Sequence, residues 1–225
     1  MRKFKKSKSA INDLLTVMAA LRSPEGCPWD REQDHMTLRY HAVEEVYELI
    51  DAIEAGDDHE IVEELGDLLL QVVFHCQLGR ERCAFDFETV ARTMTEKLVR
   101  RHPHVFGESQ AKTVDAVWAQ WDQIKKAEKE GTQRERTSAL DGVPKHLPAL
   151  LRAEKLIKKA RKANLLENEK RAAMSQSAIA RELFRLAELA QAKGWSAEEL
   201  LRGEMKKREK KWRMREVRES RRKGG

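Results

Sequence analysis

The stretch that decides the fold is residues 37–79, TLRYHAVEEVYELIDAIEAGDDHEIVEELGDLLLQVVFHCQLG. Its apolar residues recur every three or four positions, as on one face of an α-helix, and no part of it alternates as a half-buried β-strand does. Gly56 and Asp57 interrupt the pattern and mark a reversal of the chain. We therefore predict two helices, 37–55 and 58–79, joined as a hairpin.

Helical periodicity also dominates the rest of the chain, so the sequence predicts an all-α fold. Asp58, Asp86 and Thr113 are expected N-caps, because their side chains can accept hydrogen bonds from the first free amides of a helix. Ser196 with Glu199 makes a capping box. The further helices that we expect cover residues 10–22, 86–101, 113–130, 148–163, 174–193 and 196–218.

Four carboxylates fall on facing sides of the predicted hairpin. Glu45 and Glu48 lie three residues apart on the first helix, so they project from one face at adjacent turns. Glu64 and Asp67 repeat this spacing on the second helix. The chain reversal places Glu48 level with Glu64. It likewise places Glu45 level with Asp67, so the four acids share roughly 5 Å of helix length at a rise of about 1.5 Å per residue.

Carboxylates this close repel one another and have raised pKa values unless a cation neutralises them. Oxygen ligands without a nearby histidine or cysteine favour Mg²⁺, or Mn²⁺, over zinc, and Mg²⁺ readily shares its ligands with phosphate. The alternative is a pair of solvated helix faces. Against it, Asp67 lies in a run of leucines, where an unpaired buried carboxylate is costly. Gly66 beside it costs about 1 kcal/mol of helix propensity, which close helix approach or ligand access would explain.

Charge is unevenly distributed along the 225 residues, which carry a formal net charge of +6. Basic residues gather in 2–8 and 205–225, which leaves the centre acidic. We interpret the basic tail as a solvated helix end, in preference to a contact with nucleic acid or an acidic partner. The three cysteines show no paired metal-ligand spacing, and no long apolar run occurs. These features predict a chain of the reducing cytoplasm that does not enter a membrane.

Two segments lack helical periodicity. Residues 23–35 hold two prolines and a glycine, which exclude a continuous helix, and we interpret Trp29 within them as a hydrophobic plug rather than a ligand contact. Residues 131–148 are polar and also hold two prolines. We therefore expect a catalytic helical domain at 1–130, a linker at 131–147, and a second helical region with a basic tail at 148–225.

The second region resembles a worn copy of the first. Its residues 182–190, ELFRLAELA, echo residues 64–72, ELGDLLLQV, with Arg185 at the position of Asp67. The second region also has no counterpart of EEVYE at 44–48. We therefore expect one acidic cluster per chain, in the first region, and a degenerate second repeat that supports structure or assembly.

Four motifs follow one another along the chain: Cys27-Pro-Trp-Asp-Arg-Glu-Gln, Glu44-Glu-Val-Tyr-Glu, Glu64-Leu-Gly-Asp and Arg101-His-Pro-His-Val-Phe-Gly. Their order resembles the MazG family of nucleoside triphosphate pyrophosphohydrolases. The resemblance covers residues 10–165 and extends weakly into the tail. It implies a MazG-like helical bundle built from hairpins of partner chains, hence a homodimer or larger assembly. It also implies that Mg²⁺ bound by the two acidic pairs supports cleavage between the α and β phosphates, which yields a nucleoside monophosphate and pyrophosphate.

The resemblance also implies which residues bind substrate. Lys97, Arg100 and Arg101 match the family's basic run that meets phosphate, a role for which guanidinium and ammonium groups are suited. An ordinary basic helix end is the alternative. Trp121 and Lys125 match the family's substrate-contacting pair, although Trp121 also fits an apolar stripe of its helix.

Glu45 and Glu48 are the candidate catalytic carboxylates, and we expect Glu45 to orient the attacking water. Two other functions remain open. One is a superfamily pyrophosphohydrolase specific for dUTP or phosphoribosyl-ATP. The other is a noncatalytic module for nucleotide binding or dimerisation. Either hydrolase would serve house-cleaning or control of the nucleotide pool.

Overall fold

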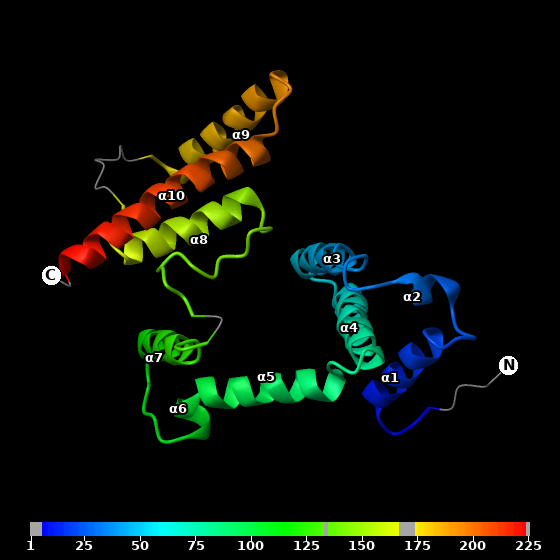
Figure 1. Ribbon diagram of the computed structural model, residues 1–225. Coiled ribbons are helices and arrows are strands. Elements are labelled where there is room, and N and C mark those ends of the chain that lie inside the picture. The colour runs from blue at the N-terminus through cyan, green and yellow to red at the C-terminus, as the bar shows by residue number, and fades with distance from the viewer. Residues whose placement is uncertain (1–5, 133–134, 167–173, 224–225) are drawn as a thin grey trace. The chain divides into compact units, whose positions relative to one another are not determined.

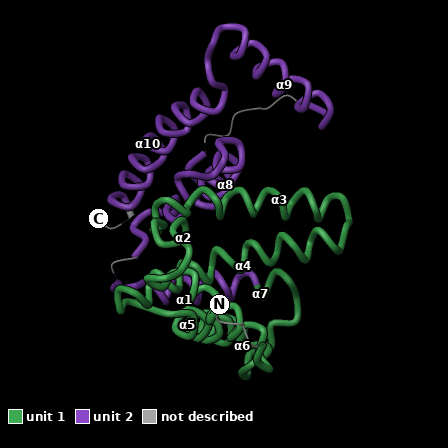
Figure 2. Tube along the Cα trace, turned by 90° about the vertical axis from the view of Figure 1, so that its right-hand side faces the viewer, with its two compact units in different colours: residues 1–117 green, residues 118–225 purple. Residues whose placement is uncertain are grey.

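The computed structural model describes residues 6–132, 135–166 and 174–223. All regular structure in these ranges is helical, which confirms the predicted all-α class (Figure 1). The helices form two compact units, residues 1–117 and 118–225 (Figure 2), and the division falls within α7 (Val114–Ala127). The domain boundaries predicted at 130 and 148 stay a prediction.

The first unit is organised around a long helical hairpin. Its helices α3 and α4 lie side by side in antiparallel directions (Figure 2). Residues 37–40, expected to be helical, precede α3 as turns. The helices of this unit are α1 (Ala10–Leu21), α2 (Pro28–Glu32), α3 (His41–Ala55), α4 (Asp58–Glu81), α5 (Phe87–Arg101) and α6 (Pro103–Phe106).

The turn of the hairpin has the conformation that its residues favour. Gly56 ends α3 with a left-handed φ of 71°, and its amide donates to the carbonyl oxygens of Ala52 and Ile53 at 3.1 and 3.2 Å. Asp57, and not Asp58 as predicted, caps α4. Its extended backbone lets the carboxylate accept a hydrogen bond from the amide of His59 at 2.9 Å, whereas Asp58 is already the first helical residue.

The core of the first unit lies between α1 and the second half of α4. It comprises Met18, Leu38, Val73, Phe74 and Leu78. Because this core is formed by residues 73–78 of α4, the first half of α4 is left to pair with α3. The hairpin therefore extends beyond the core and presents much of its surface to solvent.

The segment between α1 and α3 is tied down by Arg22. Its guanidinium donates to the carboxylate of Glu81 on α4 at 2.6 and 2.7 Å and to the carbonyl oxygen of Gln33 at 3.1 Å. The segment also contains the short helix α2, which begins at Pro28, because proline suits the first position of a helix. Trp29 is not a buried plug as predicted. Its side chain is 54% exposed, and its ring meets His41 edge-on.

The second unit contains α8 (Ala149–Lys162), α9 (Gln176–Ala192) and α10 (Ala197–Lys223). Its core joins α8 and α10 through Leu156, Met205 and Trp212. Leu140 also belongs to this core at 1% exposure, although it lies in the segment that was expected to be a linker. Helix α10 continues five residues beyond the predicted end at 218. Within the described ranges, no helix has the length and apolarity needed to cross a membrane.

Candidate functional site

Three of the four predicted carboxylates come together on the hairpin. Glu45 and Glu48 project from α3 and Glu64 projects from α4, and one carboxylate oxygen of each lies within 4.8 Å of the others. The 3.6-residue helical period explains this arrangement, because positions 45 and 48 share the face of α3 that packs on α4. The site is therefore built from two rigid helices and not from a loop.

Asp67 lies at the edge of this group. Its carboxylate is not among the oxygens within 4.8 Å, yet its charge raises the pKa of Glu45 more than any other neighbouring charge does. For Glu64, the largest such effect comes from Glu48. These pairings agree with the predicted register, in which Glu45 lies level with Asp67 and Glu48 with Glu64.

The electrostatics of the site favour a bound cation. Burial and the surrounding carboxylates raise the pKa of Glu45, although a hydrogen bond from Gln71 opposes this shift. Burial, followed by repulsion from Glu48 and Asp67, raises the pKa of Glu64. One oxygen of Glu64, Oε2, is buried without a hydrogen-bond partner among the described residues. A bound cation would neutralise these carboxylates and would give the buried oxygen of Glu64 a partner.

Gln71 is a site residue that the sequence analysis missed. Its side-chain nitrogen Nε2 donates to Oε1 of Glu45 at 3.1 Å. The signal was present in the spacing, since Gln71 follows Asp67 by four residues and Glu64 by seven and so shares their face of α4. It was overlooked because Gln71 stands in an apolar run that reads as core.

The predicted phosphate-binding residues Lys97, Arg100 and Arg101 lie in the last two turns of α5. Lys97 and Arg101 are half-buried, whereas Arg100 is exposed. Basic side chains at a helix C-terminus also face the negative end of the helix dipole, so their position suits both a phosphate-binding role and an ordinary helix end.

Trp121 and Lys125 come together on α7, as the spacing of four residues on a helix requires. The ammonium nitrogen of Lys125 lies 5.2 Å from the centroid of the Trp121 ring, within the range of a cation–π contact. Trp118 packs edge-on against Trp121, with ring centroids 5.4 Å apart. Trp121 is half-buried and is therefore neither a fully enclosed core residue nor a free surface residue.

The second unit has no comparable acidic group in its described residues. Arg185, at the position that corresponds to Asp67, instead donates to the carboxylate of Glu182 at 2.7 and 2.8 Å. Glu182 is thereby neutralised, and an ion pair replaces the carboxylate pair of α4.

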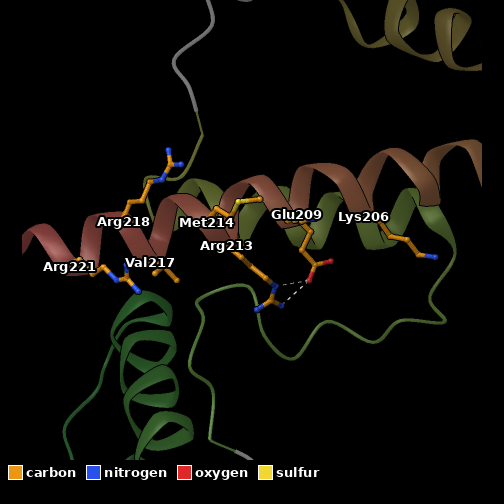
Figure 3. A pocket seen from close by; sticks show the side chains of 8 residues that line it. Lys206, Glu209, Arg213, Met214, Val217, Arg218 and Arg221 are labelled. Atoms are coloured by element: carbon orange, nitrogen blue, oxygen red, sulfur yellow. Dashed lines mark hydrogen bonds and ion pairs between the residues drawn. The ribbon is translucent and has the colours of Figure 1, made fainter.

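A groove on α10 is basic, in contrast to the acidic site on the hairpin (Figure 3). Five of its eight lining side chains are cationic and one is anionic. The anionic residue, Glu209, is engaged by Arg213 at 2.8 Å, and Arg213 also donates to Asp141 at 2.7 Å. Residues 205–223 of the basic tail thus belong to α10, whose other face packs on α8. The lining residues are Lys206, Glu209, Lys210, Arg213, Met214, Val217, Arg218 and Arg221.

Comparison with known proteins places the acidic site within a family domain. Residues 33–106 match the model of the MazG nucleotide pyrophosphohydrolase domain. The chain is 48% identical over 150 residues to the nucleoside triphosphate pyrophosphohydrolase of Escherichia coli (strain K12), which covers 66% of this chain and 56% of that protein. It is 47% identical over 146 residues to the nucleoside triphosphate pyrophosphohydrolase/pyrophosphatase MazG of Thermotoga maritima, which covers 65% of this chain and 54% of that protein.

A further relative is a 26.1 kDa protein of Streptomyces cacaoi, which is 47% identical over 155 residues and is covered over 62% of its length. The chain thus spans less than two thirds of each of these relatives. The family match includes Glu45, Glu48, Glu64 and Asp67, the residues around which the site is built. The chain therefore contains a MazG nucleotide pyrophosphohydrolase domain at residues 33–106.

Proposed function

We propose that this chain hydrolyses nucleoside triphosphates between the α and β phosphates, releasing a nucleoside monophosphate and pyrophosphate. The observation that carries the proposal is the convergence of the Glu45, Glu48 and Glu64 carboxylates within 4.8 Å on the hairpin, inside the matched family domain. The names of the relatives from Escherichia coli and Thermotoga maritima support the same reaction.

The residues of the site fit a hard divalent cation, Mg²⁺ or Mn²⁺. The ligand atoms are carboxylate oxygens, the type that these ions prefer. The raised pKa values of Glu45 and Glu64 and the unpartnered oxygen of Glu64 support the same fit. Glu45, Glu48, Glu64 and Asp67 would hold the ion. When bound, the ion offsets the charge of the phosphates and favours deprotonation of a nucleophilic water.

The protein's own side chains supply the remaining functions. We assign Glu45 to orient the attacking water, with Glu48 beside it, because both carboxylates project from α3 into the acidic cluster. Lys97, Arg100 and Arg101 would bind phosphate oxygens through charge-assisted hydrogen bonds. Trp121 would stack on the base, and Lys125 would bring a positive charge to the same ring.

We further propose that the active form contains a second copy of this chain. The outer face of α3 presents a stripe of exposed apolar side chains at spacings of three and four residues, and α4 presents another. Contiguous exposed apolar surface on helices is typical of an interface, and both stripes lie on the helices that carry the acidic site. The stripe residues are Val43, Val46, Tyr47, Ile50 and Ile53 on α3 and Val62, Leu65, Leu69 and Val72 on α4.

The remaining surfaces fit a chain of the cytoplasm. The free thiols of Cys27, Cys76 and Cys83 support a reducing compartment. We retain the solvated face as the interpretation of basic α10, with binding of nucleic acid as the less favoured alternative.

The test is pyrophosphate release from each common nucleoside triphosphate, from dUTP and from phosphoribosyl-ATP, with and without Mg²⁺. We expect Mg²⁺-dependent release, and a single accepted substrate would instead identify a specialised enzyme.

Glu48→Ala and Asp67→Ala should each reduce the rate at least about 100-fold. Glu54→Ala is the matched control, because Glu54 is an exposed carboxylate on α3 outside the cluster. Unchanged rates in both site variants would refute the site. Nucleotide binding without hydrolysis would indicate a noncatalytic module.

A further inference from the structure

Gln71 combines burial with direct contact to the acidic cluster. Gln71 is only 8% exposed and lies between the apolar residues Leu70 and Val72 of α4. Its Nε2 donates to Oε1 of Glu45, on the opposite helix of the hairpin, at 3.1 Å. A neutral polar side chain is seldom buried at this depth without a defined partner.

Only half of the Gln71 amide is satisfied. Its carbonyl oxygen Oε1 is buried and has no hydrogen-bond partner among the described residues. Turning the amide over would not help, because the oxygen would then face the carboxylate of Glu45 and lose the present hydrogen bond. A buried acceptor without a donor costs about 1–3 kcal/mol. A donor at this oxygen, such as a water molecule, would remove that cost.

That donor is absent from the surrounding acidic side chains. Glu45, Glu48, Glu64 and Asp67 offer acceptors alone when ionised. The buried Oε2 of Glu64 has no hydrogen-bond partner among the described residues either. Two buried acceptors, Oε1 of Gln71 and Oε2 of Glu64, therefore lack a donor or a cation. A hydrated cation answers both needs, since it binds carboxylate oxygens and carries water whose hydrogens are free to be donated.

We propose that Gln71 is a positioning residue of the cation site, an inference that rests on the proposed function. Its nitrogen holds one oxygen of Glu45, so that the other oxygen is left for the cation. Its carbonyl oxygen accepts a hydrogen from water in the cation's hydration shell. A neutral amide can donate and accept at once, and it adds no negative charge to a cluster in which repulsion already raises the pKa values of Glu45 and Glu64.

The chain offers a matched control for this role. Gln77 lies on the same helix, and its Nε2 donates to Oε1 of Glu81 at 3.0 Å. Gln71→Met and Gln77→Met therefore each remove one glutamine–glutamate hydrogen bond from α4 with little change in volume. Only the first removes a bond to a residue of the acidic cluster.

The experiment is calorimetric titration of the full chain with Mn²⁺ in the absence of nucleotide, together with thermal unfolding of the metal-free variants. We expect Gln71→Met to weaken Mn²⁺ binding about 10- to 100-fold, and Gln77→Met to leave it unchanged. A purely structural role would lower the unfolding temperature of Gln71→Met while the Mn²⁺ dissociation constant stayed the same. If Gln71→Met does not fold, Gln71→Asn, whose shorter amide cannot reach both partners, should show the same weakening.

The outcomes separate this inference from the proposed function. Unchanged Mn²⁺ affinity in a folded Gln71 variant would overturn the role of Gln71 alone, provided that the unsubstituted chain binds Mn²⁺ and releases pyrophosphate. Failure of the unsubstituted chain to bind Mn²⁺ would overturn both.

Discussion

Glu81 forms the ion pair that joins the end of α4 to the end of α1. The Arg22 side chain is 9% exposed, and its hydrogen bond holds the pKa of Glu81 below its ordinary value. Because the folded-state pKa is lowered, this carboxylate stabilises the fold at neutral pH, and the contribution is lost as the pH falls through the folded-state pKa. We expect Glu81→Gln to lower the free energy of unfolding by about 1–2 kcal/mol at pH 7.

Urea unfolding at pH 7 and at pH 3 measures this effect, and the difference between the two chains should shrink at the lower pH. Glu182→Gln is the control, because Glu182 forms an exposed pair with Arg185 three residues away on one helix. Such pairs contribute at most about 0.5 kcal/mol. Equal losses in both variants would mean that burial of Arg22 adds nothing to its pair.

Glu64 affects the pH dependence of stability in the opposite sense to Glu81. Burial and neighbouring carboxylates raise its pKa, so its ionised form opposes folding of the metal-free chain, and the opposition fades as the pH falls through the raised value. Glu64→Gln should therefore raise the urea midpoint at pH 7 in the presence of a chelator, and the gain should diminish toward pH 4. Mg²⁺ should stabilise the unsubstituted chain more than the variant. A lower midpoint for metal-free Glu64→Gln would contradict this account.

At the scale of the element, the helical hairpin and its carboxylate pairs could be predicted, because both follow from the spacing of neighbouring residues. Two Glu or Glu/Asp pairs at a spacing of three, on helices joined at a left-handed Gly56, suffice to bring carboxylates together. Spacing places Gln71 on the face of Glu64 and Asp67, but it does not show the hydrogen bond to Glu45, because an amide in an apolar run has the same pattern when it fills a core. The exposure of Trp29 was missed for the same reason, since burial depends on tertiary neighbours.

Gly66 is a helix-weakening residue with no packing reason inside the described chain. A Cβ added there meets nothing within 4 Å, and the same holds for Gly203 on α10. Alanine at either position should raise the free energy of unfolding of the metal-free chain by about 0.5–1 kcal/mol. Because Gly66 precedes Asp67, Gly66→Ala should also raise the KM for the nucleotide, whereas Gly203→Ala should not. Steady-state kinetics of the two variants make the comparison, and equal KM values would exclude ligand access as the reason for Gly66.

At the scale of the whole molecule, helix boundaries alone did not show which segments share a core. Residues 131–147 lack periodicity, yet Leu140 is buried with Leu156 and Trp212, and Ser138 and Ala139 donate to the carboxylate of Glu216 on α10. These contacts join positions more than 70 residues apart, so no window of sequence reveals them. The same limit applies to surfaces: a stripe of apolar residues looks alike whether its own chain or another copy covers it.

The exposed apolar stripes of α3 and α4 predict that the chain forms a dimer. If a second copy covers them, the chain should have twice its mass of 26.0 kDa in sedimentation velocity. Ile50→Asp and Val62→Asp each place a charge in one stripe, and burying that charge in an interface would be costly, so both variants should shift the chain toward monomer and lower its hydrolysis rate. Val114→Asp is the control, because Val114 is an exposed valine at the start of α7, outside both stripes. Variants that remain dimeric would place the contact on another surface, and a monomeric unsubstituted chain with full activity would show that the site is complete in one copy.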